Sequence, residues 1–161
     1  MNIWRTKLRG SEFKVTRFND TAPAGDTLDN PESLVNYLRP KLTESVIYRP
    51  DVENLIVIHL STRRKAIGFE VISTGTLDTL LVHAREVFKS AILTNAAAIV
   101  LAHNHPSGDP TPSEADIKVT RDLIRAGQLL RIDLIDHVVL GQATPERPKG
   151  WASLRELGYF A

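Results

Sequence analysis

The chain has 161 residues, a formal net charge of +1 and no cysteine. This length favours one domain, large enough to bury about 70% of the surface that the unfolded chain would expose. A net charge near zero gives no global attraction to nucleic acid, and the lack of cysteine excludes disulfides and thiolate metal ligands. The N-terminus has no apolar signal core and no stretch approaches a membrane span, so we expect a cytoplasmic protein without membrane attachment.

Residues 1–30 are predicted to form a strand and a linker that extend from the main domain. Phe13, Val15 and Phe18 alternate imperfectly with polar residues and indicate a short strand, and the polar residues 19–30 indicate the linker. Basic side chains are frequent near this strand, namely Arg5, Lys7, Arg9, Lys14 and Arg17. Such a pattern is typical of the solvated face of a strand, and contact with DNA is the alternative interpretation.

The main domain, residues 31–161, begins with a helix and a hairpin. Asn30 followed by Pro31 is typical of a helix cap and first helical position. A strand is predicted at 54–60, with an antiparallel partner at 66–72 after the polar turn STRRK.

A helix at 83–93, with Val87, Ala91 and Ile92 directed inward, then precedes a buried strand at 96–102. A second helix starts near Ser113, and Gly127 is its predicted end; its expected apolar stripe is Ala115, Val119, Leu123 and Ala126. The apolar residues 129–140 are expected to supply one or two further strands. Together the elements predict an α/β fold with a mixed, curved β-sheet flanked by helices.

Residues 103–116, HNHPSGDPTPSEAD, contain the side chains that are the best candidates for a functional site. Because strand side chains alternate, His103 and His105 share one face and Asn104 points to the other. The proline-rich and glycine-rich residues 106–112 form a shaped loop, after which Asp116 lies in the first helical turn and faces back toward the histidines. Two imidazoles and one carboxylate form a three-ligand set that is typical of a catalytic zinc site with one open position. We therefore expect one zinc ion per chain.

Ser113-x-x-Asp116 also resembles a helix capping box. Taken alone, this pair is more typical of a cap than of a catalytic site, and a lone His-x-His pair is often incidental. The coincidence of both patterns across one loop favours the metal site, and a carboxylate can cap a helix and bind a metal together.

These residues resemble the JAMM (MPN+/JAB) metalloprotease motif, an upstream Glu followed by H-x-H-x7-S-x2-D. The strings HNHPSG and PSEAD, the preceding STGT and the later Asp136-His137 pair are closest to the RadC branch. The resemblance covers about residues 30–160 and implies the cytidine-deaminase-like α/β sandwich of that superfamily. RadC proteins commonly carry a helix-hairpin-helix region, which this sequence lacks, so we expect a short, single-domain form.

A hydrolase also needs a general base. Glu44, Glu53 and Glu70 lie upstream of the motif, and the resemblance implies Glu53, at the start of the strand 54–60, with Glu70 as the second choice. The resemblance further implies hydrolysis of an amide bond by a water that the metal and Glu53 activate. Ser113 would then donate a hydrogen bond to the developing oxyanion.

The remaining histidines are expected to be structural. His59 lies in an apolar strand, and His83 begins a helix. Metal-bound imidazoles usually donate their second N–H to a polar group, and Asp136 or His137 could be such a partner. Because neighbouring strand residues face opposite ways, only one of these two can point into the site.

Three classes of function are consistent with the sequence: a zinc amidohydrolase or protease with a protein or peptide substrate, a RadC-like DNA repair protein, and a scaffold without catalysis. The intact ligand set argues against the scaffold. Asn104 replaces the hydroxyl residue that is commoner between the two histidines, which weakens any transfer of a ubiquitin-like substrate. A homodimer through exposed strand edges would also be consistent with the sequence.

Overall fold

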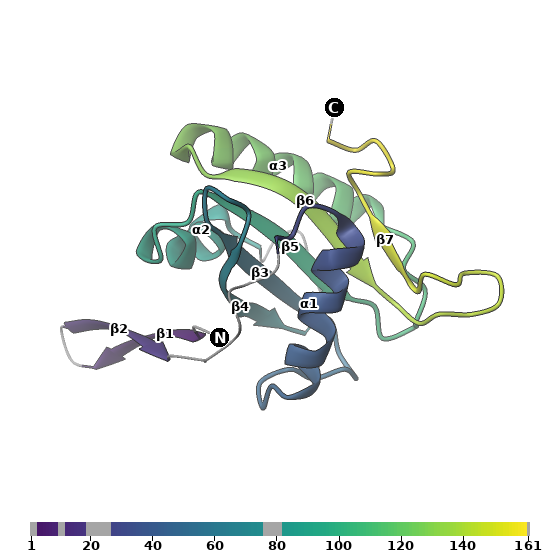
Figure 1. The fold of residues 1–161 in the computed structure, drawn as a ribbon, viewed down its shortest axis with the longest axis horizontal. Coiled ribbons are helices and arrows are strands. Elements are labelled where there is room, and N and C mark those ends of the chain that lie inside the picture. The colour runs from purple at the N-terminus through teal and green to yellow at the C-terminus, as the bar shows by residue number, and fades with distance from the viewer. Residues whose placement is uncertain (1–2, 10–11, 19–26, 76–81, 161) are drawn as a thin grey trace.

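The computed structural model describes residues 3–9, 12–18, 27–75 and 82–160, with side chains from residue 27 onward. These residues form a mixed α/β fold, as expected (Figure 1). The elements in chain order are β1 (Ile3–Arg9), β2 (Glu12–Phe18), α1 (Pro31–Thr43), β3 (Asn54–Leu60), β4 (Ala66–Thr74), α2 (Ala84–Leu93), β5 (Ala98–Asn104), α3 (Glu114–Leu130), β6 (Asp133–Leu140) and β7 (Trp151–Ser153).

The central sheet has five strands in the order β4-β3-β5-β6-β7. Its strand pairs are antiparallel except for β5 and β6, which run parallel and are connected through α3. A parallel pair needs a crossover connection, and the helix supplies it. The sheet is therefore mixed, and β5, with the two histidines at its carboxyl end, lies in its centre.

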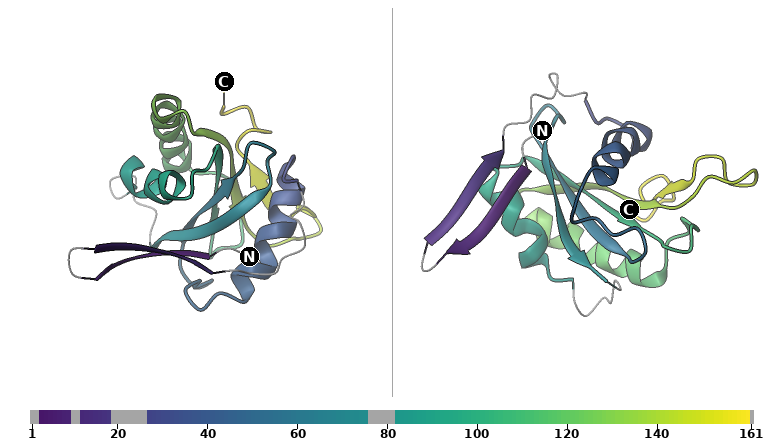
Figure 2. Two further views of the ribbon diagram at one scale, coloured as in Figure 1. Left: turned by 60° about the vertical axis from the view of Figure 1, so that its left-hand side comes forward. Right: turned by 90° about the horizontal axis from the view of Figure 1, so that it is seen from below.

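Helices cover both faces of the sheet (Figure 2). On one face, α1 packs its buried Leu34, Leu38 and Leu42 against alternate residues of β3, β5 and β6. On the other face, α2 and α3 cover the intervening residues of β3 and β5, with Phe88 and Leu123 in the core. This alternation decides which residues at the end of β5 face α3.

The first two strands pair with each other, outside the central sheet. The predicted strand around Phe13–Phe18 is present as part of β2, whereas β1 was not predicted, because its apolar residues are separated by basic ones. Figure 1 shows the two strands extending away from the central sheet. Residues 19–26 of the predicted linker lie outside the described residues, and Leu28 is fully buried against the main core.

Local sequence patterns correctly predicted the start of α1 and the bounds of β3. Asn30 caps α1 through its side chain, which accepts a hydrogen bond from the Ser33 backbone N–H, and Pro31 is the first helical residue, as predicted. The predicted strand 54–60 is confirmed. In α2, Val87 and Ala91 are buried as expected, but the inward prediction for Ile92 was wrong: its side chain is 56% exposed, and Phe88 takes the buried position.

The predictions for the end of α3 were also wrong. The helix passes through Gly127 and continues to Leu130, so residues 129 and 130 belong to the helix and not to a strand. The buried face of α3 consists of Asp116, Ile117, Thr120, Leu123 and Gly127. Of the predicted stripe, only Leu123 is fully buried. The stripe was misplaced because its spacing was counted from Ala115, and the polar Thr120 was not counted among the inward-facing residues.

Among the described residues, none of the helices combines the length and apolar character that crossing a membrane requires.

Candidate metal centre

Three side chains converge where β5 ends and α3 begins. His103 is on β5, His105 follows the strand, and Asp116 is the third residue of α3. Their donor atoms all lie within 4.8 Å of one another, and they form a group that can hold a metal ion. His103 and Asp116 are buried, whereas His105 is partly open to solvent. The site is therefore built into the core on one side and accessible on the other.

The distances fit a small metal ion. The Nε2 atoms of His103 and His105 are 2.9 Å apart. Asp116 Oδ1 lies 3.3 Å from the first of these nitrogens, and Oδ2 lies 3.7 Å from the second. Zinc bonds of about 2.0 Å at tetrahedral angles would separate two ligand atoms by roughly 3.3 Å. The three side chains need only small adjustments to bind one ion.

A backbone carbonyl fixes the tautomer of His105. Its Nδ1 lies 2.7 Å from the carbonyl oxygen of Asp109, in the loop that follows. A carbonyl only accepts hydrogen bonds, so Nδ1 carries the proton and, in the neutral ring, Nε2 presents its lone pair to the site. This is the arrangement that a metal-binding histidine requires.

The capping box holds Asp116 at the helix start. The Ser113 backbone N–H and hydroxyl both donate to Asp116 Oδ2, at 2.7 and 2.6 Å. In return, the Asp116 backbone N–H donates to the Ser113 hydroxyl oxygen at 3.2 Å. The same carboxylate thus caps the helix and faces the two histidines. In this geometry the Ser113 proton points at Asp116, so an oxyanion contact would require the hydroxyl to rotate.

The electrostatics keep Asp116 ionised. Burial acts to raise the pKa of Asp116, but the neighbouring imidazoles of His103 and His105 outweigh it and hold the pKa well below its usual range. The same contact raises the pKa of His105, and Glu53 adds a smaller electrostatic contribution in the same direction. A metal ion that bound there would displace the proton from His105, so its binding would depend on pH.

Glu53 immediately precedes β3 and is half-buried. β3 runs antiparallel to β5, and Leu55 pairs with His103. Glu53 precedes Leu55 by two residues and acts electrostatically on the His105 ring, which follows His103 by two. Glu70 pairs with Val57 on β4, which is one strand further from β5. The structure thus brings Glu53, and not Glu70, to the site.

Asn104 fixes the backbone on both sides of Glu53. Its amide nitrogen donates to the Val52 carbonyl at 2.9 Å, and its amide oxygen accepts from the Asn54 backbone N–H at 3.0 Å. The Glu53 carbonyl accepts from the Gly75 backbone N–H at 2.8 Å. The residue between the two histidines therefore positions the segment that carries the glutamate, a role that sequence reasoning missed because Asn54 and Asn104 are 50 positions apart.

Of the pair Asp136-His137, only the histidine faces the metal centre. His137 Nε2 lies 2.8 Å from His103 Nδ1, and burial lowers the pKa of His137 well below its ordinary value. Asp136 points to the opposite face, where it accepts hydrogen bonds from the Ser153 hydroxyl at 2.9 and 2.8 Å. Thr120, which lies behind His137, was not singled out from the sequence.

The other histidines lie away from the centre. His59 is fully buried on β3 and contacts the Ser90 hydroxyl at 2.9 Å, and His83 is the exposed N-cap residue of α2.

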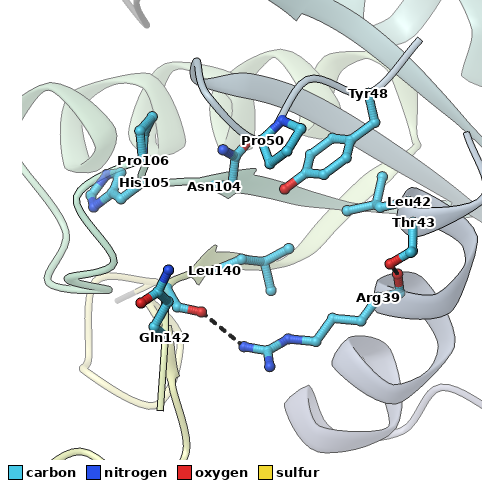
Figure 3. A pocket seen from close by; sticks show the side chains of 11 residues that line it. Arg39, Leu42, Thr43, Tyr48, Pro50, Asn104, His105, Pro106, Leu140 and Gln142 are labelled. Atoms are coloured by element: carbon cyan, nitrogen blue, oxygen red, sulfur yellow. Dashed lines mark hydrogen bonds between the residues drawn. The ribbon is translucent and has the colours of Figure 1, made fainter. Parts of the chain in front are cut away.

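A pocket of about 230 Å³ adjoins the metal centre on the side of α1 (Figure 3). His105 and Asn104 line it at one end, and the side chains of Arg39, Leu42 and Tyr48 line it at the other. Arg39 donates to the carbonyls of residues 141 and 150, at 3.1 and 2.8 Å, which holds its guanidinium at the pocket. The pocket is smaller than the roughly 300–1,000 Å³ that encloses a whole small ligand.

Comparison with known proteins assigns this region to one family model. Residues 28–159 match the RadC-like JAB domain. The chain is 44% identical over 131 residues to a UPF0758 protein of Symbiobacterium thermophilum, which covers 81% of this chain and 51% of that protein. It is 43% identical over 134 residues to a UPF0758 protein of Caldanaerobacter subterraneus, and the match covers 83% of this chain and 53% of that protein. The chain thus spans about half the length of the curated relatives that it matches.

Proposed function

The chain belongs to the family of RadC-like JAB domains, and from this membership and the site geometry we propose that it is a zinc-dependent hydrolase of amide bonds, in peptides or isopeptides. The observation that carries the proposal is the convergence of two imidazole nitrogens and one buried carboxylate, with Glu53 close enough to act on the charge of His105. With no cysteine in the chain, such a nitrogen and oxygen ligand set suits zinc. A zinc ion held there would activate a water molecule at neutral pH and polarise the substrate carbonyl.

Glu53 is proposed to move the proton. Its carboxylate accepts a proton from the attacking water and delivers it to the departing amine, so that water and amide give a carboxylic acid and an amine. This transfer needs a well-placed carboxylate, and Asn104 supports the placement through the backbone on both sides of Glu53. Ser113 orients Asp116 and, after rotation of its hydroxyl, donates to the oxyanion as it develops.

The pocket beside His105 is proposed to take a substrate side chain next to the scissile bond. Its position on the α1 side would let a peptide lie across the carboxyl ends of β5 and β6, with its carbonyl at the metal centre. Arg39 is the one permanently charged group in the lining and favours side chains that accept hydrogen bonds. A protein or peptide substrate is part of this proposal.

The test compares zinc content with turnover. We expect about one zinc per chain in the wild type by elemental analysis, and none in Asp116→Ala. Glu53→Gln should keep the zinc and lose roughly 10²–10⁴-fold in turnover, because the proton acceptor is gone. Turnover is measured by mass spectrometry on a mixed panel of peptides and lysine isopeptides.

Glu44→Gln is the matched control. Glu44 is an exposed residue at the end of α1, outside the metal centre, and its replacement should change neither zinc content nor turnover. Full activity in Glu53→Gln would eliminate Glu53 as the base. A wild type that neither contains zinc nor takes it up would eliminate the zinc hydrolase.

A further inference from the structure

A chain of hydrogen bonds runs from His103 into the core, away from the metal centre. His103 Nδ1 lies 2.8 Å from His137 Nε2, and His137 Nδ1 lies 2.6 Å from the Thr120 hydroxyl. That hydroxyl lies 2.7 Å from the backbone carbonyl of Asp116, one helical turn earlier. His103, Thr120 and His137 are all fully buried. With no solvent to supply partners, the proton on each ring must follow from these contacts.

The backbone carbonyl of Asp116, at the end of this series of hydrogen bonds, sets the direction of every bond in it. It can only accept, so the single proton of the Thr120 hydroxyl points toward Asp116. The Thr120 oxygen then accepts from His137 Nδ1–H, and the bare Nε2 of the neutral His137 ring accepts from His103 Nδ1–H. His103 is left with an unprotonated Nε2 on the metal side. If the Thr120 proton turned to His137 instead, both rings would invert, and the bond to Asp116 would be lost.

The other side of His103 favours the opposite tautomer. Its Nε2 faces the lone pair of His105 Nε2 at 2.9 Å and Asp116 Oδ1 at 3.3 Å, both of which accept protons. These neighbours would draw the His103 proton onto Nε2 and so block a metal ion. His105 meets no such conflict, because the Asp109 carbonyl fixes its ring directly. Among the residues that the structure describes, His137 and Thr120 are the ones that act on the other nitrogen of His103.

We propose that Thr120 and His137 are positioning residues that hold His103 in the tautomer whose Nε2 binds the metal ion. They connect the two buried ligands, because the hydroxyl that orients His137 is bonded to the backbone of Asp116. The inference rests on the metal site of the proposed function but not on the reaction. Its test is therefore made on metal binding.

The experiment measures zinc affinity by competition with a chromophoric chelator. Thr120→Val removes the hydroxyl at nearly constant shape, and we expect roughly 10–100-fold weaker zinc binding. Thr120→Ser restores the hydroxyl and should bind within about threefold of the wild type. Thr94→Val is the matched control, because Thr94 makes the same bond to a carbonyl four residues earlier, at the end of α2. Its zinc affinity should equal that of the wild type. Wild-type affinity in Thr120→Val would overturn the proposal.

A spectroscopic measurement on the wild type covers the case in which Thr120→Val fails to fold. Long-range ¹H–¹⁵N correlation spectra of the zinc-loaded protein, with labelled histidine, show which ring nitrogen carries each proton. We expect protonated Nδ1 on His103, His105 and His137. A proton on His137 Nε2, or coordination of His103 through Nδ1, would overturn the proposal. A wild type that binds no zinc would overturn both this inference and the proposed function, whereas zinc binding without hydrolysis would overturn only the latter.

Discussion

Asp116 combines two roles that are usually assigned to different residues. Its Oδ2 receives both hydrogen bonds from Ser113 and completes the cap of α3, while Oδ1 faces His103. A carboxylate at a helix N-terminus is stabilised by the free N–H groups and the helix dipole, which favour negative charge. The helix start therefore supplies an ionised and oriented carboxylate that could bind a metal ion. The capping interpretation and the metal interpretation describe the same geometry.

His59 makes a pH-dependent contribution to stability. Burial lowers its pKa from 6.5 to about 4, so the folded protein binds this proton less readily than the unfolded chain does. The contribution is complete above pH 6.5 and is lost as the pH falls through the folded pKa. Because one pKa unit corresponds to about 1.4 kcal/mol, we expect the free energy of unfolding to fall by up to about 3 kcal/mol between pH 6.5 and pH 4.

Urea unfolding of the metal-free protein at a series of pH values measures this loss. His137 is buried as well and adds to the pH dependence of the wild type, so the comparison is with His59→Gln. The glutamine cannot titrate and retains a polar group near the Ser90 hydroxyl. The variant should lose the part of the pH dependence that belongs to His59, and an unchanged slope would contradict the assignment.

At the scale of elements, α3 is more than a cover for the sheet. Its buried face includes two polar residues, Asp116 and Thr120, which face the ends of β5 and β6. Both are hydrogen-bonded, which makes their burial tolerable. The site therefore depends on how closely this helix approaches the sheet, and Gly127 sets that approach near the other end of the helix.

Gly127→Ala should destabilise the protein although alanine is the better helix former. An added Cβ would lie 2.5 Å from the Ile132 carbonyl oxygen and 3.3 Å from the Phe88 ring. Relief of this clash requires the backbone to shift, and we expect a loss of roughly 1–3 kcal/mol in thermal or urea unfolding. Gln128→Ala, on the exposed side of the same turn, should change stability by less than about 0.5 kcal/mol. Equal effects of the two substitutions would refute the packing argument.

At the scale of the whole molecule, the candidate metal centre joins elements that are separated in the sequence. His103 belongs to the central strand, Asp116 to the following helix, and Glu53 to the entry of a third element. A ligand that binds only when these parts are assembled stabilises the assembled state by mass action. Metal binding should therefore be visible in the stability of the entire fold.

Zinc at about 100 times its dissociation constant should add about 2.7 kcal/mol to the free energy of unfolding. For a chain of this size, that corresponds to a rise of roughly 5–10 °C in Tm, which a chelator should reverse. Differential scanning calorimetry of wild type and Asp116→Ala measures the effect, which the variant should lose. Asp122→Ala, an exposed carboxylate on the same helix, should retain it. A wild type without any response would contradict a metal site built from these elements.

The sequence alone was sufficient for the arrangement that is local in the chain. Residues 103–116 form one strand-loop-helix unit, so strand alternation, proline and glycine positions and a capping pattern together predict how two histidines and Asp116 meet. The α/β class followed from the same local periodicities. Where local patterns were ambiguous, prediction failed: Gly127 looked like a helix end, and the apolar residues 129 and 130 looked like a strand. Only the packing of α3 against Phe88 and Ile132 decides these cases.

The tertiary structure decided everything that depends on strand register. Glu53 acts electrostatically on His105 because β3 pairs antiparallel with β5, and Asn104 fixes the backbone on both sides of Glu53 for the same reason. His137 lies behind His103 because β6 pairs in parallel with β5, with a register shift that no local pattern encodes. Side-chain alternation and caps involve neighbours a few residues apart, whereas register is fixed by the packing of whole strands and helices. The ligand set could thus be predicted from sequence spacing, while the residues that orient it required the assembled sheet.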